Sequence, residues 1–297
     1  GHPASRALVA GAESVMAVRF EWLRVGWCRH LECMAARGAR LARVDFPSYC
    51  GLLQHPQHGW MLYDTGYSEQ FFGATERLPE RLYRSMLPVQ LPAEDCLLTQ
   101  LAARGLSADD IGHIIVSHYH GDHVAGLRDF PRARYIALRA DSEALLGLRG
   151  KRWRATLGGQ LPGLLPEDFL TRLQHADDCP TRPLPAWMAP FESGLDLFAD
   201  GSLLGVPLPG HSNGQLGLYI ADADGRPVLL AADACYSLPA CREGRLPPAP
   251  TLWFSSADHQ AYRRTFAALG ALSLREPALA ILPSHCSAAR EDFQHGT

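Results

Sequence analysis

Ser117-His118-Tyr119-His120-Gly121-Asp122-His123 is the stretch that decides the fold of this chain, because it gathers four side chains able to bind a metal within six residues. Neutral imidazole and carboxylate are ligands that a catalytic zinc prefers, with one position left for water. The β-branched run at residues 114–116 comes directly before the cluster and predicts a buried strand. The sequence therefore predicts a metal site at the end of a strand.

The spacing inside this stretch predicts more than one metal ion. His118 and His120 are two residues apart, so they point the same way from an extended segment. Asp122 and His123 follow Gly121 and need a turn that re-aims them. Two ligands on one side and two on another indicate two adjacent metals. The alternative is a His-rich loop that binds no metal, but such tracts usually lack this approach from a core strand.

Three further apolar runs end close to a residue of ligand type. They are residues 203–208 before His211, residues 228–232 before Asp233, and residues 278–282 before His285. Taken singly, an aspartate after a strand is more often a turn or helix cap, and a lone histidine is more often packed or on the surface. Their shared placement at strand ends makes all three candidate ligands.

The order His-x-His-x-Asp-His, then Gly-His, then Asp, then His resembles the metallo-β-lactamase superfamily of hydrolases. The resemblance implies an α/β (α+β) fold, a four-layer αββα sandwich. It implies two divalent metal ions, with zinc expected first, although iron, manganese or cobalt also suit this mixed set of ligands. It also implies the ligand sets: His118, His120 and His211 for one metal, Asp122, His123 and His285 for the other, and Asp233 as the bridge.

Asp64 is a further candidate, in Leu62-Tyr63-Asp64-Thr65-Gly66, which resembles the Asp-Thr-Gly found ahead of the main motif of the family. In the family this aspartate lies behind the ligands, where a carboxylate fixes the tautomer and tilt of a ligating imidazole. The alternative is an ordinary turn residue before Gly66. The sequence leaves both readings of Asp64 open.

The metal set predicts hydrolysis without a covalent nucleophile. A hydroxide shared by two ions would attack an ester-like carbonyl, and Asp122 is the candidate to hydrogen-bond that hydroxide or to shuttle a proton. Tyr236 stands three residues after Asp233. This spacing resembles the acyl-homoserine lactonases, in which a tyrosine contacts the substrate carbonyl, and a neutral phenol is a suitable donor to an oxyanion. The alternative for Tyr236 is a partly buried aromatic residue after a strand.

A lactone of the acyl-homoserine lactone type is therefore the predicted small-molecule substrate. One difference is that Gly121 stands where those lactonases often carry a bulky apolar residue. The alternatives are a thioesterase of the glyoxalase II-like kind and a ligand-sensing or regulatory module with little turnover on the same fold.

Composition narrows the class of partner. The net charge of -3 shows no electrostatic footprint for nucleic acid, and no apolar stretch is long enough to span a membrane. The eight scattered cysteines favour reduced thiols and a cytoplasmic location. We expect one domain at residues 16–297 and an added or flexible N-terminal segment at residues 1–15, and a homodimer is the candidate assembly.

The coarse secondary structure alternates strands and helices. Strands are expected near residues 15–22, 41–45, 49–54, 60–64, 114–116, 135–138, 195–198, 203–208, 216–221, 228–232 and 278–282. Helices are expected near residues 93–104, 122–127, 141–148 and 257–272. Residues 149–194 carry six prolines among large apolar residues and interrupt this pattern. We expect a cap over the metal site there; a structural insertion or a dimer contact is the alternative.

Overall fold

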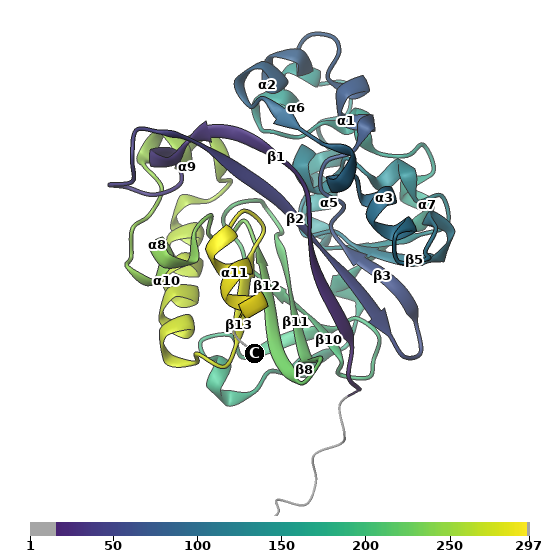
Figure 1. The fold of residues 1–297 in the computed structure, drawn as a ribbon, viewed down its shortest axis with the longest axis vertical. Coiled ribbons are helices and arrows are strands. Elements are labelled where there is room, and N and C mark those ends of the chain that lie inside the picture. The colour runs from purple at the N-terminus through teal and green to yellow at the C-terminus, as the bar shows by residue number, and fades with distance from the viewer. Residues whose placement is uncertain (1–15, 296–297) are drawn as a thin grey trace, which may run out of the picture.

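The computed structural model describes residues 16–295, and within this range two β-sheets face each other with helices on both outer sides (Figure 1). The predicted four-layer αββα sandwich is confirmed. The expectation for residues 1–15 lies outside the described residues. None of the helices at residues 16–295 combines the length and the apolar character needed to cross a membrane.

The first sheet contains the two long strands that run through the middle of Figure 1. Its order is β4 (Val89–Gln90), β1 (Arg19–Leu31), β2 (Arg43–His55), β3 (Gly59–Tyr63), β5 (Ile111–Ile115), β6 (Arg134–Ala137) and β7 (Leu173–His175). The neighbouring strands β3, β5, β6 and β7 are parallel to one another, and the other pairs of this sheet are antiparallel. The parallel strands end at one edge, which is where loops of an α/β sheet carry functional residues.

The second sheet is built mainly of antiparallel strands. Its order is β13 (Ala280–Pro283), β12 (Arg226–Ala232), β11 (Leu216–Ala223), β10 (Leu203–Pro207), β9 (Ser193–Asp196) and β8 (Thr181–Pro183). Only the pairing of β12 with β13 is parallel among the described strands of this sheet. The two strands that precede Asp233 and His285 therefore end side by side.

Helices cover the outer faces of both sheets. The α-helices are α1 (Glu69–Ala74), α2 (Glu80–Met86), α3 (Leu97–Ala102), α4 (Gly121–Val124), α5 (Arg139–Leu146), α6 (Arg152–Leu157), α7 (Phe169–Arg172), α8 (Leu238–Arg242), α9 (Ala249–Ser255), α10 (His259–Arg275) and α11 (Ser287–His295). Short 3-10 helices are η1 (Glu32–Met34), η2 (Ala93–Asp95), η3 (Ala108–Asp110), η4 (Leu127–Asp129), η5 (Pro162–Leu164), η6 (Ala176–Asp178) and η7 (Ala186–Met188). The longest helix, α10, begins after Asp258, whose carboxylate accepts from two free N–H groups of the first turn.

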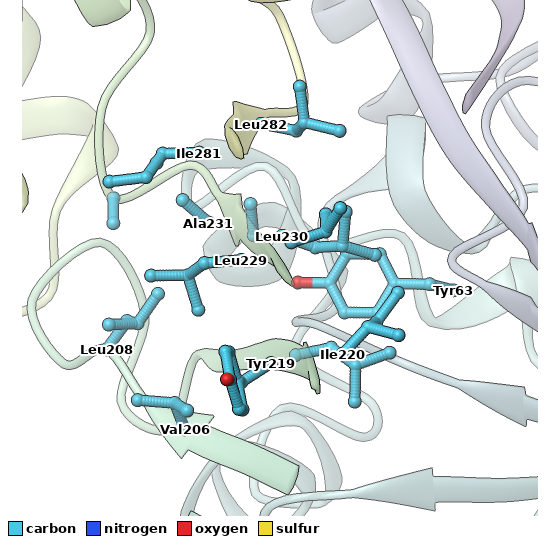
Figure 2. Packing of buried hydrophobic residues seen from close by; sticks show 14 of the residues in the cluster. Tyr63, Val206, Leu208, Tyr219, Ile220, Leu229, Leu230, Ala231, Ile281 and Leu282 are labelled. Atoms are coloured by element: carbon cyan, nitrogen blue, oxygen red, sulfur yellow. The ribbon is translucent and has the colours of Figure 1, made fainter. Parts of the chain in front are cut away.

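Side-chain alternation along β3 explains how the layers join. Met61 and Tyr63 point into the core between the sheets, whereas Leu62 packs against the helices of the outer layer. Figure 2 shows Tyr63 reaching from the first sheet toward the buried strand residues Leu229 and Leu230 of the second. Its hydroxyl donates to the carbonyl of Leu216 at 2.8 Å, so this core residue joins the two sheets.

Several predicted elements differ from the structure in their bounds. Residues 41–45 and 49–54, which were expected as two strands, are one strand, β2, with Pro47 inside it. Pro47 pairs with Trp27 beside a register shift in β1, and such an irregularity tolerates a residue that has no N–H. The helix expected at residues 93–104 is interrupted at Cys96, which is extended, and Gly105 follows α3 with the left-handed φ expected of a C-terminal cap.

Candidate metal centre

The segment after β5 brings four of the predicted ligands to one end of the sandwich. His120 is still on extended backbone, and α4 then begins at Gly121. This short helix turns the side chains of Asp122 and His123 in a new direction, as we predicted from the presence of Gly121. Nε2 of His118 lies 3.0 Å from Nδ1 of His120, so the two rings converge on one point.

A first group of candidate ligands forms around this point. Nε2 of His211, from the loop after β10, lies 2.9 Å from Nδ1 of His120. One ligand atom from each of His118, His120, His211 and Asp233 falls within 4.8 Å of the others. Ring nitrogens bound at the usual 2.0–2.1 Å to one tetrahedral ion would stand about 3.3 Å apart, close to the observed spacing. These four residues could hold one metal ion.

A second group lies beside the first and consists of Asp122, His123 and His285. Oδ2 of Asp122 is 3.3 Å from Nε2 of His285. Asp233 stands between the groups, because its Oδ2 is 3.3 Å from Nε2 of His211 and 3.2 Å from Nε2 of His285. Its Oδ1 is 3.3 Å from Nε2 of His123. The structure thus brings all seven predicted ligands together in the predicted arrangement, and their binding of metal stays a prediction.

Asp64 lies behind the second group, at a backbone φ of 61°, and is fully buried. Its carboxylate accepts from the N–H and the hydroxyl of Ser117, both at 2.7 Å, and lies 2.8 Å from Nδ1 of His123. The bond to Nδ1 leaves the lone pair of His123 on Nε2, toward Asp233. The two sequence readings of Asp64, a turn residue and a carboxylate behind a ligand, are compatible in this geometry.

The other imidazoles are held from behind in the same way. Nδ1 of His285 is 2.6 Å from the carbonyl oxygen of Pro47, and Nδ1 of His118 is 3.0 Å from the hydroxyl of Ser117. A partner on the outer nitrogen fixes the tautomer, so the inner nitrogen faces the centre with a lone pair. Sequence reasoning missed Pro47 and Ser117 in this role.

Two buried polar atoms test whether a cation fits here. Among the described residues, Nε2 of His123 and Oδ1 of Asp233 have no hydrogen-bond partner although both are buried. Buried polar atoms normally have one. A metal cation bound to both atoms would satisfy them together, so the donor set fits the group that the family implies.

Electrostatics separate the two groups. Burial, followed by the neighbouring histidines, lowers the pKa of His118 well below its ordinary value, and burial likewise lowers the pKa of His211. For His285 the burial effect is outweighed by Asp233 and Asp122, which raise its pKa to about 9. The same carboxylates raise the pKa of His123 against burial. The histidines of the first group are therefore neutral and can each offer a lone pair to a metal. In the second group, a metal ion would have to displace a proton from the histidines.

Tyr236 lies on the loop after β12 and borders both groups. Its ring is 5.9 Å from the ring of His211 and 6.0 Å from that of His285, centroid to centroid. Its hydroxyl is 3.3 Å from Nδ1 of His211. Burial, and then Asp233, raise the pKa of Tyr236, so the phenol stays neutral. If Nε2 of His211 faces the metal, Nδ1–H donates to the phenol oxygen and leaves the hydroxyl proton available to another acceptor.

Hydrogen bonds from neighbouring elements hold the ligand loops in place. The backbone carbonyl of Ser117 accepts from the N–H of Leu216 at 2.8 Å, and the hydroxyl of Ser48 donates to the carbonyl of Asp122 at 2.7 Å. Ser142, at the start of α5, is 2.8 Å from the hydroxyl of Tyr119. Next to it, Asp141 accepts from the N–H of Gly214 at 3.4 Å, and burial raises the pKa of its carboxyl to about 6. The sequence suggested only a helix start at Asp141 and Ser142.

Residues 149–194, which interrupt the predicted alternation, lie in two different parts of the structure. After α6, the turn at Gly158 and Gly159 reaches the centre, where Gln160 forms an isolated bridge with His120. Farther along, β7 pairs with β6 and β8 pairs with β9, so these parts extend the edges of the two sheets. The stretch therefore lies partly at the centre and partly at the sheet edges, and its role as a cap stays a prediction.

A second cluster of ligand-type residues lies at the other end of β3 and consists of His55, His58 and Asp200. Nδ1 of His55 accepts from the backbone N–H groups of Gln57 and His58 at 3.1 and 3.2 Å. Nε2 must then carry the proton, and it lies 2.9 Å from the hydroxyl of Ser202 and 3.0 Å from Oδ2 of Asp200. In this tautomer His55 has no lone pair left for a cation, so it cannot act as a metal ligand.

Comparison with known proteins agrees with this geometry. A family model described as the metallo-beta-lactamase superfamily matches residues 43–285. The N-acyl homoserine lactonase AttM of Azorhizobium caulinodans is 30% identical over 163 residues, which is 54% of this chain and 54% of that protein. The N-acyl homoserine lactonase AiiB of Agrobacterium fabrum is 28% identical over 211 residues, covering 68% and 70%. The chain thus spans about half the length of several curated relatives that it matches.

Solved structures agree on the fold. An N-acyl homoserine lactone hydrolase with the product N-hexanoyl-L-homoserine bound at its catalytic metal centre superimposes with a TM-score of 0.68, at 20% identity, over 93% of this chain and 97% of that one. The dizinc quorum-quenching lactonase AidC gives a TM-score of 0.61 at 16% identity, over 93% and 90%. This chain belongs to the metallo-β-lactamase superfamily.

Proposed function

We propose that this protein is a binuclear metal-dependent hydrolase that opens a lactone ring, with an acyl-homoserine lactone as the substrate type. In this proposal His118, His120 and His211 hold one ion, Asp122, His123 and His285 hold the other, and Asp233 joins them. The observation that carries the proposal is the convergence of these seven side chains on two adjacent points, with buried donor atoms that lack other partners.

When bound, two divalent ions would polarise a carbonyl oxygen and bring the pKa of water toward neutrality. The side chains of this protein supply the rest. Asp64 and the carbonyl of Pro47 keep His123 and His285 in the tautomer that faces the centre. Asp122 is the most exposed carboxylate of the centre, with 14% of its side chain accessible against 4% for Asp233. It is therefore placed to accept a proton and pass it to solvent.

Tyr236 supports the choice of a lactone. Because its phenol is neutral and its oxygen lies beside His211, its hydroxyl proton can be donated to the carbonyl oxygen of an ester as negative charge develops there. Relatives named as N-acyl homoserine lactonases add support for a cyclic ester rather than a thioester. The proposal extends to zinc as the metal, to a cytoplasmic location and to a small-molecule substrate without nucleic acid or membrane partners.

The test combines metal content with a substrate panel. Elemental analysis of the purified protein should give two metal ions per chain, and lactone hydrolysis should be lost with a chelator and restored with zinc. Acyl-homoserine lactones should be hydrolysed at least tenfold more efficiently, by kcat/KM, than acyl thioesters of matched chain length. A thioester preference would favour the thioesterase alternative, and no turnover of either class by the fully metallated protein would favour a sensing module.

The variant Tyr236→Phe tests the narrower claim. We expect kcat for the lactone to fall about 10- to 1,000-fold, as for loss of one donor to a developing oxyanion, while metal content stays at two. Tyr219→Phe is the matched control, because that phenol lies in β11 against Trp187 in the core. Equal lactone kinetics in both variants would remove Tyr236 from the mechanism.

A further inference from the structure

The segment at residues 158–161, between α6 and η5, lies directly against the main motif. Gln160 bridges to His120, and the carbonyl of Gly159 accepts from the N–H of Gly121 at 3.3 Å. Both contacts are made by the backbone of a stretch that interrupts the regular alternation of the fold. The sequence gives no signal for them, because a backbone contact leaves no mark on residue type.

This segment also supplies the partner behind His120. The carbonyl of Gly158 accepts a hydrogen bond from the His120 ring, whose Nδ1 faces His118 and His211. His118, His123 and His285 receive the equivalent contact from the sheet framework or the motif itself. His120 alone among these four takes its support from residues 149–194.

Gly159 allows this approach because it has no side chain. Its φ is +74°, and a Cβ there would stand 3.2 Å from Cδ2 and 3.4 Å from Nε2 of His120. Gly150, in the same stretch, has nearly the same φ of +75°, yet a Cβ there would meet nothing within 4 Å. The two glycines share a backbone conformation and differ in their contact with the ligand.

Leu161 completes the contact on the other side of the motif. It is 2% exposed, and its Cδ1 lies 2.9 Å from where a Cβ of Gly121 would be. A side chain at position 121 would therefore collide with Leu161. Leu161, from the segment at residues 158–161, therefore fills the space beside Asp122 that a side chain at position 121 would otherwise occupy.

We propose that residues 158–161 are a positioning segment for the metal centre, in which Gly158 and Gly159 set the His120 ring and Leu161 takes the place of a side chain at Gly121. The inference rests on the two-metal centre of the proposed function. Its specific consequence is that disturbing the segment weakens the ion held by His118, His120 and His211 and leaves the ion held by Asp122, His123 and His285 in place.

The test measures zinc affinity at each position by competition with a chromophoric chelator. Gly159→Ala should weaken one of the two ions about 10- to 100-fold, the usual effect of losing a partner behind a ligand, and leave the second ion at its original affinity. Gly150→Ala, the matched control, should bind both ions as the unmodified protein does. Unchanged affinities in Gly159→Ala, or equal weakening of both ions in the two variants, would overturn the proposal.

A second pair of variants keeps the test informative if Gly159→Ala does not fold. Gly121→Ala should weaken the same ion through its collision with Leu161, and Gly121→Ala with Leu161→Ala should recover most of that affinity. No recovery in the double variant counts against the role of Leu161. Failure of the unmodified protein to bind two ions would contradict the proposed function instead, so the two ideas fail by different results.

Discussion

Two groups of histidine and aspartate lie at opposite ends of β3, and they differ in the lone pairs that their histidines leave for a metal. At one end, beside Pro47, the imidazoles of His118, His123 and His285 use the outer nitrogen for a protein partner and turn the inner nitrogen to the centre. At the other end, His55 accepts two backbone N–H groups on one nitrogen and donates from the other. The residue types are the same.

The difference teaches that ligand capacity depends on the nitrogen left over after the protein has made its own hydrogen bonds. A neutral imidazole has one N–H and one lone pair. Where the protein takes only the N–H, as Asp64 does with His123, the lone pair remains for a cation. Where it takes both, as around His55, none remains. Substitutions at the two ends should therefore have unlike effects.

Asp233→Asn should have the largest effect, since this carboxylate approaches both groups of the proposed centre. We expect fewer than two bound ions and a fall in lactone hydrolysis of about 10³-fold or more, because metal stabilisation of charge is worth several kcal/mol. Elemental analysis and kcat/KM measure this. Asp200→Asn, in the other group, should leave both quantities unchanged. An equal loss in that variant would show that the two groups do not differ in their role toward the metal.

Asp64→Asn should come next. An amide cannot accept from Ser117 and His123 as a carboxylate does, so His123 would lose the partner that orients it. Zinc affinity at the second group should fall about 10- to 100-fold in a chelator competition. Asp196→Asn is the control, since Asp196 is also buried but receives Arg182 and backbone N–H groups away from the centre. It should lower Tm without changing zinc affinity.

The pH dependence of stability should show the smaller effect of His55. Burial lowers its pKa below the ordinary 6.5; Asp200 opposes this shift and His58 adds to it. Since the unfolded state binds the proton more readily, the stabilisation from His55 is complete above pH 6.5 and is lost as pH falls below that value. Between pH 7.5 and 5.5, urea unfolding should show a larger loss for the unmodified protein than for His55→Gln. Parallel curves would mean that His55 is not held neutral.

Zinc stoichiometry should not change at all in His55→Gln. Because His55 has no lone pair to offer, titration of the unmodified protein should saturate at two ions, and the variant should saturate at the same number. Isothermal titration calorimetry at pH 7.5 measures both. A third ion that disappears in the variant would show that the His55 cluster binds metal after all, and that its hydrogen bonds yield to a cation.

The sequence predicts most of the layered fold, because short apolar runs predict the buried strands. A ligand-type residue follows several of these runs. The positions of His211, Asp233 and His285 could be predicted in this way. The length of β2 could not, since a proline inside a run usually argues against a strand, and only the register shift in β1 makes room for Pro47.

The supports behind the ligands were also beyond sequence reasoning. Asp64 was noticed through a motif, but the carbonyl groups of Pro47 and Gly158 act through the backbone. Ser117 lies inside the quoted stretch, and nothing in its identity says that it contacts both His118 and Asp64. Long-range pairing of loops decides these contacts, and one chain read alone does not show it.

The bond from Tyr63 to Leu216 marks a seam between the two sheets, and the ligands stand on both sides of it. His118 to His123 follow β5 of the first sheet, whereas His211, Asp233 and His285 follow strands of the second. During synthesis on the ribosome, the early histidines emerge long before residue 285 exists. In the proposed centre, completing the metal pair therefore requires synthesis through His285, and a product truncated before that residue would carry the main motif without holding the metal pair.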